Sequence, residues 1–165
     1  MARFLMFALF VFTQTLFAGA DASEQSALGE ETRNWAEVGK LSRAAHLPVG
    51  ILISSGDCAY CSLLKREVLL PGIQDGSLSH RILLREIDLH SGGKLVDFDG
   101  ERVRSRIFIS RYKVKFTPTL LILNDAGEVI AKPLIGYRDA DDYQHALAQT
   151  LEAISSRGSA LAQND

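Results

Sequence analysis

The sequence is poor in cysteine, has little excess charge and contains no cluster of histidines. Its 165 residues include two cysteines, and 18 basic against 20 acidic side chains give a net charge of −2. That charge provides no general attraction to nucleic acid. The histidines stand apart from one another, so the sequence does not supply the four ligands of a structural zinc site; they are His46, His80, His90 and His145. A chain of this length can bury a core without disulfide staples, and we expect one domain.

The long apolar run of the chain lies at its beginning. Residues 1–20, MARFLMFALFVFTQTLFAGA, carry one charge at Arg3 and end in the small residues Ala18-Gly19-Ala20, a pattern typical of a secretory signal peptide. Polar residues at 13–15 shorten the apolar part below the ~20 residues of a membrane span. We therefore expect cleavage after Ala20, a secreted protein without a stable membrane anchor, and a compartment in which disulfides persist.

Hydrophobic spacing and turn signals divide the rest of the chain into helices and strands. Asn34 can cap a helix and Glu37 can return the bond, while Pro71-Gly72 marks the end of the helix that begins at the cysteines. The other predicted helices cover residues 35–46, 102–112 and 139–156, and the predicted strands cover 48–54, 81–89, 120–123 and 128–134. Residues 90–101 are expected to form a loop, 21–33 a flexible leader and 157–165 a flexible tail, which leaves a domain over 34–156.

This order of elements predicts an α/β fold with a mixed central sheet covered by helices on both faces. The segment 120–134 is predicted to be a hairpin around Asn124-Asp125-Ala126-Gly127. Pro133 cannot donate to a strand ladder, so the returning strand is expected at the edge of the sheet.

The two cysteines, Cys58 and Cys61, are three residues apart in SSGDCAYCSLLKRE. They could be a staple, ligands of a metal, or a reactive pair. A staple across so short a loop removes little chain entropy, and a structural zinc needs four ligands. At a helix start, free N–H groups favour a thiolate on Cys58. Cys61 then lies close enough to attack a mixed disulfide on Cys58, so this placement favours the reactive pair.

The strand GILIS, the CAYC pair opening a helix, and the later segments YKVKFTPTLLIL and NDAGEVI together resemble the thioredoxin superfamily. The resemblance covers residues 34–156 and implies the thioredoxin fold and a thiol–disulfide oxidoreductase. It implies that Cys58 attacks a partner disulfide and that Cys61 resolves the intermediate. The pair then carries the electrons itself, and no bound cofactor or metal is needed. It further implies that Pro118 follows a cis peptide bond and that the backbone of Thr117 pairs with a protein substrate like an added strand.

Within the superfamily, the signal peptide, the C-x-Y-C pair and the threonine before the proline resemble secreted bacterial members. The insertion LHSGGKLVDFDGERV resembles the SoxW-type periplasmic thioredoxins. This resemblance implies a periplasmic protein that reduces disulfides of partner proteins, with a membrane thiol-transfer protein as its electron donor. Two alternatives stay open, namely a disulfide oxidase or isomerase, and a copper-handling protein that uses both cysteines as soft ligands.

Three residues near the pair need separate comment. Leu52 stands where thioredoxin has a buried acid, so water or another group must take the proton of Cys61. Asp57 either opposes a Cys58 thiolate by its charge or caps the helix. Tyr60, between the cysteines, is a candidate substrate contact.

The segment RVRSRIFISRYKVK contains six basic residues and no acid, and it leads into Thr117-Pro118. A basic rim there could steer an acidic partner protein, and the alternative is a solvated helix face. The acidic stretch DFDGE at 97–101 lacks the ligands of a full calcium loop and is expected to be a turn before a helix.

Overall fold

The computed structural model describes residues 27–162. The predicted signal peptide, with its cleavage after Ala20, falls outside these residues, as does the end of the predicted tail. Within the described part of the chain, no helix is long and apolar enough to cross a membrane.

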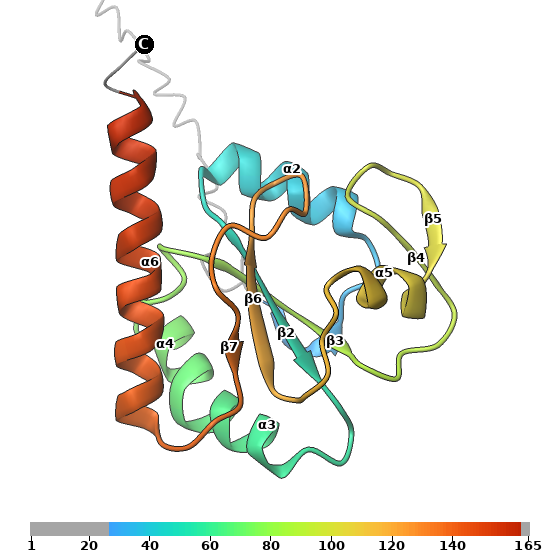
Figure 1. The fold of residues 1–165 in the computed structure, drawn as a ribbon, viewed down its shortest axis with the longest axis horizontal. Coiled ribbons are helices and arrows are strands. Elements are labelled where there is room, and N and C mark those ends of the chain that lie inside the picture. The colour runs from blue at the N-terminus through green and yellow to red at the C-terminus, as the bar shows by residue number, and fades with distance from the viewer. Residues whose placement is uncertain (1–26, 163–165) are drawn as a thin grey trace, which may run out of the picture.

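A five-stranded mixed sheet forms the centre of the fold, with its strands in the order β1-β3-β2-β6-β7 (Figure 1). β2 lies parallel to β3 and antiparallel to β6. The strands are β1 (Ala27–Glu31), β2 (Val49–Ser54), β3 (Leu83–Asp88), β6 (Thr119–Leu123) and β7 (Leu134–Ile135). The predicted mixed sheet is confirmed, and the strand that follows Pro133 lies at the edge, as expected.

Helices cover both faces of this sheet (Figure 1). One face carries α3 (Ala59–Leu64), the π-helical turn η1 (Lys65–Leu69), α4 (Leu70–Gln74) and α6 (Ala140–Ala162). The other face carries α2 (Trp35–Ala45), α5 (Ser105–Arg111) and a small hairpin of β4 (Lys94–Val96) and β5 (Arg102–Arg104). Each face has its own apolar core, with Leu52 and Leu64 on the first and Trp35, Ile53 and Phe108 on the second. Every residue of β2 is buried, as expected for a strand between two helical layers.

The start of α2 follows the sequence prediction closely. The side chain of Asn34 accepts a hydrogen bond of 3.3 Å from the backbone N–H of Glu37, and so satisfies one free donor of the first turn. The expected return bond from the Asn34 N–H to the carboxylate of Glu37 does not form, and that carboxylate accepts from Lys40 Nζ at 3.0 Å. The predicted cap is therefore confirmed, and the reciprocal half of the capping box is wrong.

The helix that begins after Cys58 does not stop at Pro71-Gly72, so that prediction is wrong. The backbone N–H of Leu70 bonds to the carbonyl of Lys65 through the π-helical turn, and α4 then continues to Gln74. Pro71 falls in the first turn of α4, where a missing N–H is tolerated. The widened turn before the proline thus lets the helical path continue.

The structure corrects the predicted elements at both ends and in the middle of the chain. Residues 27–31, expected in the flexible leader, form β1, and Thr32 N–H bonds to the carbonyl of Glu86 at 3.0 Å. α6 runs to Ala162 instead of ending near 156. The expected loop over 90–101 contains β4, and residues 102–104 form β5 instead of the first turn of a helix. The return strand of the 120–134 hairpin is reduced to a bridge at Val129 and to β7.

Candidate active site

The cysteine pair lies where the chain passes from the end of β2 into α3. Cys58 is the N-cap residue of α3, and its sulfur is bonded to that of Cys61 at 2.02 Å. Cys58 is partly exposed, whereas Cys61 is 2% exposed. Cys58 is therefore the cysteine that solvent reaches, and Cys61 lies inside the protein.

The first turn of the helix presents a donor to the sulfur of Cys58. The backbone N–H of Cys61 lies 3.1 Å from Cys58 Sγ, and an N–H in this position also stabilises a thiolate once the disulfide opens. Asp57 is exposed, and the capping residue is Cys58 rather than Asp57. The interpretation of Asp57 as the helix cap is therefore wrong.

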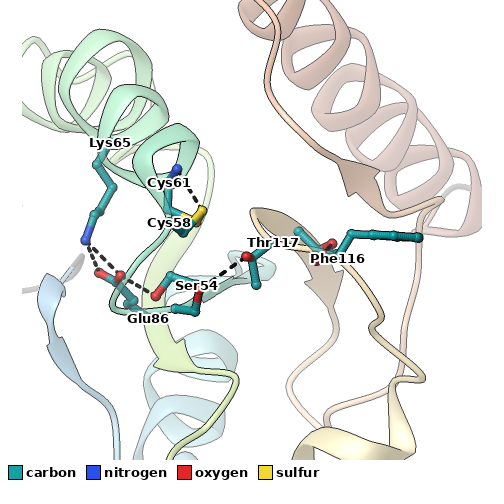
Figure 2. Close-up of a disulfide and its surroundings, with 9 residues drawn as sticks. Ser54, Cys58, Cys61, Lys65, Glu86, Phe116 and Thr117 are labelled. Carbon is teal, nitrogen blue, oxygen red and sulfur yellow. Dashed lines mark hydrogen bonds and ion pairs between the residues drawn. A yellow bond between two sulfur atoms is a disulfide. The ribbon is translucent and has the colours of Figure 1, made fainter.

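Thr117 lies on the segment that faces the cysteine loop, although it is far from the cysteines in sequence, and Pro118 follows it directly (Figure 2). The peptide bond between them is cis, which is the isomer that the resemblance implies. Ser55 Oγ and Thr117 Oγ1 are 3.4 Å apart, which connects the cysteine loop to this segment. The carbonyl of Pro118 accepts from Gly136 N–H at 2.8 Å. Among residues 27–162, neither the N–H nor the carbonyl of Thr117 has a hydrogen-bond partner.

Three exposed apolar side chains belong to the segments that carry or adjoin the cysteine pair and the Thr117-Pro118 step. Tyr60 is 59% exposed, Phe116 65% and Ile135 63%. Tyr60 lies in the cysteine pair, Phe116 precedes Thr117, and Ile135 pairs with Thr119 at the edge of the sheet. Sequence reasoning missed Phe116 and Ile135. The position of Phe116 directly before the Thr-Pro step is a signal that could have found it.

A partly buried ion pair lies to one side of the disulfide, where Lys65, just after α3, reaches Glu86 of β3 (Figure 2). Lys65 Nζ lies 2.8 and 3.2 Å from the two carboxylate oxygens of Glu86, and Ser54 Oγ donates to the same carboxylate at 2.7 Å. Glu86 pairs across the sheet with Leu52, the residue that stands in place of the thioredoxin acid. Sequence reasoning also missed this group, although Lys65 stands one helical turn after Cys61.

The basic segment and the acidic turn are joined by an ion pair. Arg111 of α5 pairs with the buried carboxylate of Asp97, so this cation has a structural partner. The predicted turn over 97–101 is confirmed, with Gly100 N–H bonded to the carbonyl of Asp97 at 3.0 Å, but it leads into β5 and not directly into a helix. Among residues 27–162, no group of three or more His, Cys, Asp or Glu side chains could hold a metal ion.

Comparison with known proteins supports the same superfamily. The family model of the thioredoxin-like domain matches residues 36–151. A thioredoxin from Thermus thermophilus is 22% identical with a TM-score of 0.54, over 81% of this chain and 94% of that one. The DsbH oxidoreductase is 14% identical with a TM-score of 0.52, over 84% and 94%. The DsbD C-terminal domain of Neisseria meningitidis is 15% identical with a TM-score of 0.50, over 73% and 99%.

No curated protein sequence matches the chain, and the structural likenesses show the fold alone. The family model, by contrast, spans most of the chain, from α2 to α6, and includes both cysteines and the Thr117-Pro118 step. The chain therefore belongs to the thioredoxin-like family, and its disulfide-bonded Cys-x-x-Cys pair makes it a thiol–disulfide oxidoreductase.

Proposed function

We propose that the protein reduces disulfides of partner proteins in the bacterial periplasm. The observation that carries this proposal is the asymmetry of the pair, with Cys58 accessible at a helix start and Cys61 buried behind it. The Cys58 thiolate attacks one sulfur of the partner disulfide, and the other partner sulfur leaves as a thiolate and takes a proton. Cys61, after losing its proton, attacks Cys58 Sγ. This step closes the Cys58–Cys61 disulfide and releases the second partner thiol, so two electrons have passed to the partner.

The partner docks across the surface around the disulfide. An extended segment of the partner pairs with the free N–H and carbonyl of Thr117, as in strand addition, and Pro118 frames this groove. Tyr60, Phe116 and Ile135 contact apolar side chains of the partner. The backbone contact accepts many sequences, so the apolar contacts determine which partners bind well.

The proposed location and electron supply follow from the resemblance to secreted bacterial members, including the SoxW type. Residues 1–20 have the pattern of a signal peptide. A compartment in which disulfides persist does not keep a dithiol reduced, so a reductase there needs a dedicated donor. We assign this role to a membrane thiol-transfer protein.

Trapping of intermediates tests the order of attack. In the Cys61→Ser variant, the mixed disulfide on Cys58 cannot be resolved, so we expect partner proteins to accumulate as adducts on non-reducing gels. The Cys58→Ser variant lacks the accessible nucleophile and should form few adducts. Equal trapping by both variants, or none by either, would contradict the mechanism.

The reduction potential of the pair tests the direction of electron flow. Equilibration of the full chain with glutathione should give a value of about −250 mV or below, toward the thioredoxin end of the scale. A value near about −120 mV is that of a strong oxidant, and it would replace the reductase with a disulfide oxidase.

A further inference from the structure

The Lys65–Glu86 pair needs a functional explanation because of its place in the fold. Its side chains are 25% and 9% exposed, and a pair that is largely removed from water adds little net stability compared with apolar residues of similar size. Ser54, which donates to Glu86, is also buried. A charged group of this kind next to a reactive cysteine is well placed to control ionisation.

The helix places Lys65 on the same face as Cys61. The two residues are four apart, so their Cβ atoms are about 5–6 Å apart on one side of the helix. Figure 2 shows the Lys65 side chain descending from the helix that begins at the cysteines to the carboxylate of Glu86, which Ser54 contacts from the other side. Cys61 is 2% exposed, so water cannot solvate a thiolate there, and another group must stabilise the negative charge.

We propose that Lys65 is the counter-ion of the Cys61 thiolate, and that Glu86, held by Ser54, positions Lys65 and partly neutralises it. This inference rests on the proposed dithiol mechanism and concerns its second step. There the Cys61 thiol loses its proton to solvent, and the thiolate attacks Cys58 Sγ of the mixed disulfide. The partner sulfur leaves as a thiolate and takes up one proton, so charge and electrons balance. The transient negative charge on Cys61 forms one helical turn from Lys65, whose ammonium group the carboxylate of Glu86 already holds in place.

The other charged side chains near Cys61 are exposed or bonded to other partners. β2 and residues 116–123 contain no charged side chain. Asp57 is exposed in the loop before the helix, and Asp88, at the end of β3, accepts from His90 N–H at 2.7 Å. On the outer side of the helix, Glu67 is held by Arg66 and by the hydroxyl of Tyr137. The Lys65–Glu86 pair is therefore the charged group that we expect to have the largest effect on the ionisation of Cys61.

Replacing Lys65 and replacing Glu86 should shift the titration midpoint of the Cys61 thiol in opposite directions. The test uses the full, reduced chain carrying Cys58→Ser, in which Cys61 is the single cysteine, and follows thiolate formation by ultraviolet absorbance against pH. Lys65→Met removes the counter-ion, and we expect the titration midpoint to rise by about one pH unit or more. Glu86→Gln frees the charge of Lys65, and we expect the midpoint to fall. Lys65→Arg keeps the charge and should keep the midpoint near that of the parent chain.

A neighbouring exposed pair on the same helix supplies the matched controls. Arg66→Met and Glu67→Gln remove charges that face water, and solvent screening should keep their shifts within about 0.3 pH unit. Shifts of the same sign for Lys65→Met and Glu86→Gln, or no shift from Lys65→Met in a chain with unchanged circular dichroism, would overturn the inference. If Glu86→Gln does not fold, the comparison of Lys65→Met with Lys65→Arg tests the inference, since equal midpoints in these two variants would contradict it. The titration needs no partner protein, so its failure is distinct from a failure of the trapping experiment.

Discussion

Replacement of Phe116 by alanine should weaken the reaction with protein disulfides and leave the chemistry of the pair unchanged. Phe116 is 65% exposed, and a phenylalanine side chain carries roughly 200 Å², so about 130 Å² remains in contact with water. If a docked partner covers half of that area, the burial is worth about 1.6 kcal/mol at ~25 cal/mol/Å². We therefore expect kcat/KM for a protein disulfide to fall by about fifteenfold. The free energy of unfolding should change by less than about 0.5 kcal/mol, because the ring is exposed.

The assay compares a protein disulfide with glutathione disulfide, which is too small to cover the apolar surface. The Phe116→Ala variant should react with glutathione disulfide at the rate of the parent chain, since the alanine keeps the backbone carbonyl that accepts from Thr119 Oγ1. Val129→Ala is the matched control. Val129 is 46% exposed and pairs with Leu123, at the other end of β6 from Thr119. An equal loss of rate with both substrates, or an equal loss in the control, would refute the docking role of Phe116.

Two further predictions concern stability and ionisation. Gly39→Ala should destabilise the protein by about 1–3 kcal/mol in urea titrations, because a Cβ there would lie 2.5 Å from the carbonyl oxygen of Asp125. This steric cost should exceed the gain of about 1 kcal/mol that alanine brings to a helix. An unchanged or increased free energy of unfolding would contradict this packing. Tyr137 donates to Glu67 at 2.5 Å, and this bond, followed by that from Arg66, holds the pKa of Glu67 below its ordinary value of 4.5. Tyr137→Phe should raise the pKa of Glu67 toward 4.5 in an NMR titration. The stabilisation of the folded protein by this bond should be present above pH 4.5 and lost as the pH falls through the lowered pKa. An unchanged pKa of Glu67 would show that Tyr137 is not the main cause of the shift.

The difference in exposure between Cys58 and Cys61 was predictable because it depends on local structure. Residues three apart at a helix start occupy neighbouring turns, so the outer cysteine meets the free N–H groups and the inner one enters the core. The cap at Asn34 and the buried strand β2 follow from equally local patterns. The thioredoxin-like order of elements was visible for the same reason, since each main helix and strand carries its own periodic signal.

The elements that the sequence did not reveal depend on partners that are distant along the chain. β1 contains small and acidic residues, and its backbone is held by β3 across more than fifty residues. The β4–β5 hairpin is closed by cross-strand pairing and by the contact of Arg111 with Asp97. The continuation of the helix through Pro71 depends on a π-helical turn, which has no simple residue pattern.

The cysteine pair, its helix and the family to which the chain belongs were thus determined by the sequence itself, because short-range spacing specifies them. The surroundings of the pair were decided by the tertiary structure. The register of β2 against β3 places Glu86 opposite Leu52, and the helix then brings Lys65 over it. Sequence alone showed that the usual acid was missing at Leu52. It could not show that a neighbouring strand supplies a carboxylate, because register is set by the burial of whole strand faces.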